Sequence, residues 1–514
     1  MIGIILEDNA FEQDIRELLM AFYPGETFVH EEKPEMSFYV ECKKNKEQTG
    51  YELNIVNYGT AVSHAGFPKD ENMSGSLRQE WEDWQEGRPV PIVEGNRLET
   101  KNRIKRRLYF MLREQTGKEL PWGSLTGIRP SKIAITLLEE GKTREEIARH
   151  VRDTYLASDE KTDLMIKTAE NERRLLSAFD YKNGYSLYIG IPFCPTTCLY
   201  CSFTSFPIGR WKERTQEYLN VLYKEMDYVA GAMKKPTQHG AGNGDGYPLH
   251  LDTVYFGGGT PTSLSAEDLD QLLSRLEETF PLDGIQEFTV EAGRPDSITR
   301  EKLEVLKKHH ITRISINPQT MKQETLDLIG RHHTVDMVKD CFHMARELGF
   351  DNINMDLIVG LPEEDLEDVR RTMEEIKALG PDSITVHSLA IKRASRLNTD
   401  KERYGNLSIQ NTQEMIDLTA AYARDMGMEP YYLYRQKNMA GNFENVGYSK
   451  PGKACLYNIL IMEEKQTITA CGAGTTTKVV FPAENRRERT ENVKDVEQYI
   501  SRIDEMIDRK KALL

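Results

Sequence analysis

Hydrophobic positions in the first 180 residues follow two different periods. Short apolar runs and alternating positions predict strands over residues 2–6, 38–42 and 51–56. Apolar residues spaced three and four apart predict helices over residues 11–23, 105–115, 132–140, 146–155 and 162–179. Pro and Gly residues interrupt the pattern over residues 67–96, where we expect turns. We therefore expect residues 1–180 to form an α+β N-terminal accessory domain without a catalytic constellation of its own.

From Tyr185 onward, short apolar segments alternate with longer amphipathic ones. The predicted strands cover residues 186–191, 253–256, 288–291, 313–316, 352–358 and 383–388. The predicted helices include residues 217–232, 266–279, 335–348 and 366–379. Repeated strand–helix units predict parallel strands with right-handed crossovers. We expect an α/β fold in which residues 181–392 form a partial (β/α)6 TIM-like barrel, with residues 234–248 as an exposed loop.

Beyond residue 392 the regular alternation fades. Residues 410–426 predict a helix, short strands and Gly-rich turns follow up to Gly474, and a charged helix is predicted over residues 493–512. We expect residues 393–514 to form a C-terminal domain that covers the open end of the barrel and the substrate bound there.

The composition narrows the class of protein. The chain has 514 residues, of which 39% are hydrophobic and 29% are charged, as is usual for a globular protein of several domains. The formal net charge of -15 argues against a nucleic-acid binder, because such proteins carry basic surfaces. No apolar run is long enough to span a membrane, and the first residues lack the features of a signal peptide. These features predict a cytoplasmic protein.

Three of the seven cysteines stand within eight residues, as C-x3-C-x2-C at Cys194, Cys198 and Cys201, directly after a predicted strand. Parallel α/β barrels build their sites from the loops that follow their strands. Three thiolates can bind three irons of a cubane cluster and leave the fourth iron open. Two alternatives stay open. A zinc site needs four ligands, and no further Cys or His follows before His239. Three buried free cysteines would also fit a core.

The cysteine triplet and the Tyr-x-x-x-Pro that begins at Tyr188 resemble the signature of radical S-adenosylmethionine (SAM) enzymes of the oxygen-independent coproporphyrinogen III oxidase family. The resemblance covers residues 186–474. The N-terminal extension and the sequence Gly-Ser-Leu-Thr-Gly-Ile-Arg-Pro at residues 123–130 are similar to the HemZ-like branch, the coproporphyrinogen dehydrogenases. The resemblance implies a radical SAM barrel, a [4Fe–4S] cluster on Cys194, Cys198 and Cys201, and SAM as a second cofactor.

The same resemblance assigns further residues to SAM. They are Tyr200, Gly257, Gly258, Gly259, Thr260, Glu291, Gln319, Arg331 and Asp356. The glycines and Glu291 match family residues at the SAM methionine, and Arg331 matches an arginine that pairs with the SAM carboxylate. Gln319 and Asp356 match ribose-binding residues, and the Tyr200 backbone is expected at the adenine. Taken singly, the glycines are more often a simple turn, and each polar residue is more often a solvated charge or a strand-end polar residue.

Tyr188 resembles a family tyrosine close to the substrate, and we treat it as the candidate catalytic residue, with a core tyrosine as the alternative. A tetrapyrrole with several carboxylates also needs cationic partners. The candidates are Arg210, Lys392, Arg393, Arg396 and Arg435, although a solvated surface role is the default for each. One departure matters: Phe203 stands where authentic oxidases of the family often carry a fourth cysteine, and haem chaperones of the superfamily lack that cysteine as well.

The resemblance implies that coproporphyrinogen III is oxidatively decarboxylated to protoporphyrinogen IX in haem (porphyrin) biosynthesis, with an unidentified electron donor such as flavodoxin or ferredoxin. Two alternatives stay open. One is another radical SAM enzyme acting on a tetrapyrrole, such as a haem-degrading methyltransferase. The other is a non-catalytic haem-binding chaperone.

Overall fold

The computed structural model describes residues 1–7, 9–31, 33–57, 73–203, 205–234, 249–392, 394–436 and 439–514. The chain divides into two compact units. Unit 1 comprises residues 1–170 and 434–444, and unit 2 comprises residues 171–433 and 445–514. No helix in these described ranges is both long and apolar enough to cross a membrane. Most of the predicted exposed loop at residues 234–248 lies outside the described residues.

Unit 1 is built on a five-stranded sheet in the order β2-β1-β3-β4-β5. Its strands are β1 (Ile2–Leu6), β2 (Phe28–Val29), β3 (Phe38–Lys44), β4 (Gly50–Asn57) and β5 (Val90–Pro91). Strand β1 is parallel to β2 and β3, whereas β4 is antiparallel to its neighbours. The helices are α1 (Glu12–Phe22), α2 (Gly75–Gln85), α3 (Arg97–Thr116), α4 (Ser131–Glu139), α5 (Arg144–Tyr155) and α6 (Asp159–Leu176), the last of which continues into unit 2. The predicted strands are confirmed.

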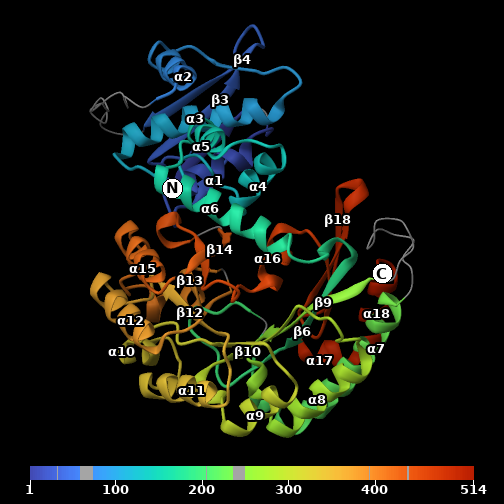
Figure 1. The fold of residues 1–514 in the computed structure, drawn as a ribbon. Coiled ribbons are helices and arrows are strands. Elements are labelled where there is room, and N and C mark those ends of the chain that lie inside the picture. Colours follow the sequence, from blue (N-terminus) through green and yellow to red (C-terminus); the bar gives the residue numbers. More distant parts are fainter. Residues whose placement is uncertain are drawn as a thin grey trace. The chain divides into compact units, whose positions relative to one another are not determined.

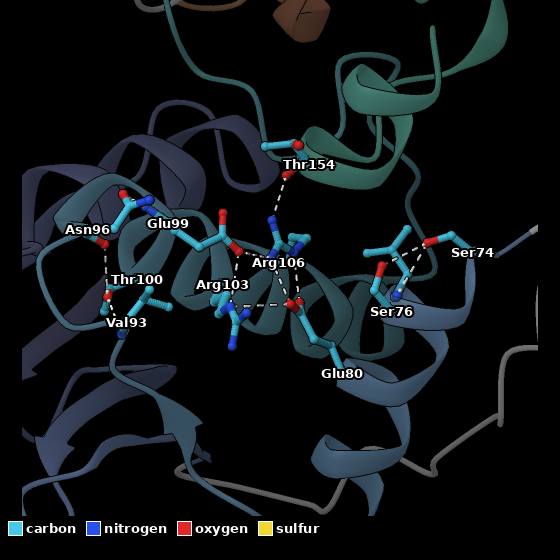
Figure 2. Close-up of polar contacts among 11 residues, drawn as sticks. Ser74, Ser76, Glu80, Val93, Asn96, Glu99, Thr100, Arg103, Arg106 and Thr154 are labelled. Atoms are coloured by element: carbon cyan, nitrogen blue, oxygen red, sulfur yellow. Dashed lines mark hydrogen bonds and ion pairs between the residues drawn. The ribbon is translucent and has the colours of Figure 1, made fainter. Parts of the chain in front are cut away.

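Helix α2 corrects the prediction of turns over residues 67–96. Ser74 caps its N-terminus by accepting a hydrogen bond from the Leu77 amide. Figure 2 shows that the Arg106 guanidinium on α3 donates two hydrogen bonds of 2.7 Å to the Glu80 carboxylate on α2. The hydrophobic pattern does not predict this helix, because an ion pair to another helix stabilises it and because the glycines at its two ends predict turns.

Unit 2 contains an eleven-stranded sheet in the order β14-β15-β13-β12-β11-β10-β9-β6-β16-β17-β18. The central six strands are β6 (Gly184–Ile191), β9 (His250–Gly258), β10 (Glu287–Gly293), β11 (Arg313–Ile316), β12 (Ile353–Val359) and β13 (Ser383–Ser388). Each is parallel to the next. Because β6 and β13 each pair with other strands, the described sheet is open rather than closed on itself. The predicted α/β fold is confirmed, and it takes the form of a partial barrel.

Helices connect successive parallel strands. They are α7 (Thr215–Met233), α8 (Ala266–Thr279), α9 (Arg300–Lys308), α10 (Gln323–Leu328), α11 (Val335–Glu347) and α12 (Leu366–Leu379). Of these, α7, α8, α9, α11 and α12 follow one another around the sheet (Figure 1). A two-stranded ladder of β7 (Phe193–Cys194) and β8 (Phe206–Pro207) lies between β6 and α7 in the sequence. The C-terminal ends of the six strands therefore carry the loops in which the predicted site residues stand.

Strands from residues 393–514 extend the same sheet at both edges. They are β14 (Glu429–Tyr434), β15 (Asn445–Ser449), β16 (Thr467–Cys471), β17 (Thr476–Phe481) and β18 (Arg486–Glu491). Strand β15 is antiparallel to β13, and β16 is parallel to β6. Residues 393–433 and 445–514 thus belong to the same compact unit as the barrel strands, and residues 434–444 belong to unit 1. That residues 393–514 cover a substrate stays a prediction.

The remaining helices are α13 (Arg396–Thr399), α14 (Lys401–Tyr404), α15 (Gln413–Asp425), α16 (Leu456–Glu463), α17 (Val496–Ser501) and α18 (Ile503–Lys511). The last two replace the single predicted helix over residues 493–512, because Arg502 has a non-helical backbone at φ -119° and ψ 27°. Asp495 caps α17 by accepting a hydrogen bond from the Gln498 amide, so the helix also begins later than predicted.

Candidate functional site

The three clustered cysteines follow the C-terminal end of β6. Cys194 and Cys198 are buried, Cys201 is partly exposed, and all seven cysteines of the chain are free thiols. Burial raises the pKa of the Cys194 thiol to about 11, and the neighbouring Cys201 and Cys198 raise it further, although Thr260 lowers it. The pKa of Cys201 is raised by burial as well. A strongly positive group nearby would favour the thiolate forms of Cys194 and Cys201.

The donor set fits an iron–sulfur cluster better than a single ion. Among the described residues, no group of three or more His, Cys, Asp or Glu side chains could hold one metal ion. A tetrahedral zinc site requires four ligands around one centre. A cubane cluster instead takes each cysteine on a different iron, so its thiolates need not converge on one point. The three cysteines therefore fit a [4Fe–4S] cluster.

The glycine motif packs against both the cysteine loop and the barrel interior. A Cβ atom on Gly259 would lie 2.5 Å from the Phe193 carbonyl oxygen and 3.0 Å from the Cys194 sulfur. A Cβ on Gly257 would lie 3.0 Å from the Tyr188 hydroxyl and 3.3 Å from the Glu291 carboxyl carbon. The approach at Gly259 leaves no room for a side chain, and at Gly257 the neighbouring side chains would have to shift. Thr260, the next residue, lies with its hydroxyl 3.5 Å from the Cys194 sulfur.

Glu291 lies near the end of β10 and is enclosed by other side chains. The Tyr255 hydroxyl donates a 2.6 Å hydrogen bond to Glu291 Oε1. Burial raises the pKa of Glu291 to about 7, with a further contribution from the negative charge of Asp356, whereas the bond from Tyr255 lowers it. A carboxylate in such surroundings gains from a cationic or hydrogen-bond-donating ligand.

Gln319, in the loop after β11, lies beside Asp356, in the middle of β12. The Gln319 amide donates to the Asp356 carbonyl oxygen at 3.0 Å, and the Ile358 amide donates to the Gln319 carbonyl oxygen at 2.9 Å. Gln319 has a φ of +70°, a left-handed conformation that is uncommon for a residue other than glycine. The Asp356 carboxylate accepts a 2.7 Å bond from the Asn354 side chain. These backbone contacts hold Gln319 beside Asp356 of β12.

Arg331 donates hydrogen bonds to the backbone of the loop that leads from β11 to Gln319. Its Nη1 donates to the carbonyl oxygens of Asn317 and Pro318, at 2.5 and 3.1 Å, immediately before Gln319. Arg331 and Gln319 are buried, yet the Arg331 Nε and the Gln319 Oε1 find no hydrogen-bond partner among the described residues. Buried polar atoms in native proteins are almost always paired. This strand-end group, defined as Glu291, Gln319, Arg331 and Asp356, therefore fits a polar ligand such as SAM.

Tyr188 belongs to a group of three stacked aromatic rings. Its ring centroid lies 6.0 Å from those of Tyr255 on β9 and Tyr457 on α16, which are 4.5 Å from each other. Burial, followed by the charge of Glu291, raises the pKa of Tyr188 above its ordinary value. The stack joins Tyr188 to Glu291 through Tyr255. Its catalytic role stays a prediction.

Tyr200 lies in an apolar cluster with Leu199, Ile329 and Ile358. The backbone of Leu199, one residue before it, is bonded on both sides: its amide donates to the Ile329 carbonyl at 2.9 Å, and its carbonyl accepts from the Leu397 amide at 3.0 Å. The cluster supplies an apolar surface beside the cysteine loop, which suits the adenine expected there.

The structure adds one residue that the sequence did not single out, Arg294, which contacts the cysteine loop from the end of β10. The signal was an arginine directly after a strand in Gly293-Arg294-Pro295-Asp296. Of the predicted substrate cations, Arg435 lies in unit 1, where its guanidinium donates to the carbonyl oxygens of Leu125 and Asn442. Arg393 lies outside the described residues.

Comparisons with known proteins agree with this arrangement. The family model for the radical SAM superfamily matches residues 188–376, which include all the predicted site residues. The structure of coproporphyrinogen III oxidase (HemN) from Escherichia coli, a radical SAM enzyme, superposes with a TM-score of 0.50 and 22% identity, covering 65% of this chain and 73% of that one. This likeness concerns the fold. The radical SAM family implies a [4Fe–4S] cluster and SAM.

Two curated relatives extend the comparison. The heme chaperone HemW of Bacillus subtilis is 30% identical over 321 residues, 62% of this chain and 76% of the relative. The oxygen-independent coproporphyrinogen-III oxidase-like protein HemZ of the same organism is 41% identical over 414 residues, 80% of each chain. The chain therefore belongs to the radical SAM superfamily and, within it, to the family of oxygen-independent coproporphyrinogen-III oxidase-like proteins.

Proposed function

We propose that this chain is a radical SAM oxidoreductase that binds a [4Fe–4S] cluster on Cys194, Cys198 and Cys201, and SAM on the strand-end group. Two observations support this assignment. Thr260 and Gly259 lie against Cys194, and Gly257 lies close to Glu291. When bound, the cluster supplies one electron to SAM, whose cleavage gives methionine and a 5′-deoxyadenosyl radical. The work of the chain is to orient SAM and to exclude water from the radical.

The residues of the strand-end group divide this work. Glu291 accepts a hydrogen bond from the SAM amino group, and Tyr255 holds its carboxylate in place. Asp356 and the unpaired Gln319 Oε1 accept hydrogen bonds from the ribose hydroxyls. The unpaired Nε of Arg331 donates to the SAM carboxylate. Each of these atoms gains a partner that the chain alone does not provide.

For the substrate we propose coproporphyrinogen III. With both cofactors bound, the chemistry supplied would be removal of a hydrogen atom from the β-carbon of a propionate, with carbon dioxide and one electron, passed to an external acceptor, lost to leave a vinyl group. Two propionates treated in turn give protoporphyrinogen IX. The observation that carries this proposal is the likeness to the HemZ relative, which extends over 414 residues and so reaches well beyond residues 188–376 of the cofactor-binding core.

A second candidate is a haem-binding chaperone. The HemW relative favours it, and so does Phe203, which is 77% exposed at the position where oxidases often carry a fourth cysteine. An exposed aromatic ring beside the cysteine loop offers an apolar surface to a flat macrocycle.

An anaerobic assay separates the candidates. Coproporphyrinogen III deuterated at the propionate β-carbons is supplied with SAM, a reductant and the reconstituted chain. We expect deuterium in 5′-deoxyadenosine, released carbon dioxide and a vinyl product. Cys198→Ser should abolish all three, whereas Cys42→Ser, in the sheet of unit 1, should not. Haem bound stoichiometrically without turnover would favour the chaperone, and a methylated haem would favour a methyltransferase; either result contradicts the proposal.

A further inference from the structure

Arg294 is a buried arginine at the end of β10 whose side chain faces the cysteine loop. It is 2% exposed. Its Nη1 donates to the Thr196 carbonyl oxygen at 2.9 Å and to the Thr196 hydroxyl at 2.7 Å. The same Nη1 lies 3.8 Å from the Cys198 sulfur. Thr196 stands between the first two cysteines, so one guanidinium contacts both the loop backbone and a thiol.

The other edge of the guanidinium is fixed by Asp296. Arg294 Nε donates to Asp296 Oδ1 at 2.9 Å, and Nη2 donates to Oδ2 at 2.6 Å. This two-fold contact sets the plane of the guanidinium and turns Nη1 toward the loop. Arg294 is buried and Asp296 is 13% exposed, so water has little access to the pair.

The backbone around Arg294 is equally constrained. Gly293 before it has a φ of +69°, and Pro295 after it begins a short 3-10 helix. The Ser297 hydroxyl donates a 2.7 Å bond to the Arg294 carbonyl oxygen. The opposite side of the cysteine loop is tied down as well, since the Thr196 hydroxyl lies 3.0 Å from the Gly330 carbonyl oxygen. Arg294 thus joins the ends of two strands through Thr196.

We propose that Arg294 is a positioning residue for the cysteine loop and that its guanidinium raises the reduction potential of the cluster. The inference rests on the proposed function, because it requires the cluster. A donor to a ligating sulfur and a nearby positive charge both favour the reduced, more negative cluster. Asp296 opposes the second effect by neutralising part of the charge.

If Arg294 only held the cysteine loop in place, without an electrostatic effect on the cluster, substitutions would have different effects. Loss of either Arg294 or Asp296 would then loosen the loop and lower cluster content in the same way. If the charge of Arg294 acts on the cluster, the two losses change the potential in opposite directions. Arg294→Gln removes the positive charge and lowers the potential, whereas Asp296→Asn leaves that charge less neutralised and raises it.

The test uses the full-length chain, reconstituted anaerobically, with iron content and redox titration followed by electron paramagnetic resonance. We expect Arg294→Gln to lower the midpoint by about 59 mV or more, a tenfold change in a one-electron equilibrium. Arg294→Lys should lower it less, and Asp296→Asn should raise it. The control is Arg300→Gln, at an exposed arginine of α9 paired with Glu347.

The outcomes are distinct. A wild-type chain without iron would refute the cluster assignment and this inference together. If the wild-type chain holds iron, the role of Arg294 alone is overturned by either of two results: Arg294→Gln has the same midpoint as Arg300→Gln, or Arg294→Gln and Asp296→Asn shift the midpoint in the same direction. If Arg294→Gln fails to retain iron, Arg294→Lys and Asp296→Asn still decide between the two signs.

Discussion

Two buried polar regions of unit 2 differ in how completely their atoms are paired. The carboxylate of Glu225, on α7, is fully buried. It accepts four hydrogen bonds of 2.6 to 2.8 Å, from Lys510, Tyr499, the Gly472 amide and Asn492. At the strand-end group, by contrast, Gln319 Oε1 and Arg331 Nε have no partner among the described residues.

The difference separates structure from function. The Glu225 group ties α18 and the loop before β17 to α7, and nothing about it calls for a ligand. Unpaired buried atoms cost free energy that a folded chain normally avoids. Gln319 Oε1 and Arg331 Nε are two such atoms on residues of the same loop contact, and a ligand is the simplest source of their missing partners.

The largest effect is expected at Gly259, whose backbone packs so closely against the cysteine loop that a methyl group does not fit. Gly259→Ala would place a methyl group 2.5 Å from the Phe193 carbonyl and 3.0 Å from the Cys194 sulfur. We expect the loop to shift and the reconstituted chain to lose most of its iron. Gly231→Ala, on α7, meets nothing within 4 Å and should keep its iron. Iron and sulfide analysis decides, and equal content in the two variants would contradict this packing.

Lys510→Ala tests the paired region. Removing the ammonium leaves the Glu225 carboxylate buried without its cation, which typically costs about 3–5 kcal/mol. Denaturant unfolding should show this loss. Lys511→Ala removes an exposed lysine paired with Asp508 and should change stability little. If Lys510→Ala were as stable as Lys511→Ala, the contrast between the two regions would not be energetic.

The sequence predicted the barrel well because its signals are local. In residues 313–316 and 383–388, Ile and Val alternate with polar residues, and the two segments match β11 and β13 residue for residue. Helix α2 was not predicted, because the ion pair that joins it to α3 links residues 26 apart in the sequence. The spacing of the three cysteines in the sequence was enough to predict a cluster site. The sequence did not predict the role of Arg294, because that role depends on Thr196, which lies 98 residues away in the chain and comes near Arg294 only in the folded protein.

Glu291 makes the stability of the chain depend on pH. Its pKa is about 7 in the folded chain against an ordinary 4.5, so between these values the folded chain holds a proton that the unfolded chain releases. Stability therefore falls as pH rises from 4.5 to 7, by roughly 3 kcal/mol. Glu291→Gln removes this fall, and exposed Glu304→Gln should not. Thermal unfolding from pH 4 to 8, without SAM, compares them; parallel curves for wild type and Glu291→Gln would refute the burial of this charge.

The smallest of these effects concerns SAM itself. Asp356 lies beside Gln319 and accepts from Asn354, so its carboxylate is held in place before a ligand arrives. Hydrogen bonds to charged groups contribute about 1.5–3 kcal/mol, so Asp356→Ala should weaken SAM binding tenfold or more. Because SAM is the only new partner involved, the stability of the chain without SAM should change less than its affinity for SAM. Asp351→Ala, five residues earlier and paired with Lys453 on an exposed surface, is the matched control. Equilibrium binding to the reconstituted chain measures both variants. An Asp356→Ala chain that binds SAM as tightly as Asp351→Ala would move the ribose away from the end of β12 and leave the unpaired Gln319 oxygen without an explanation.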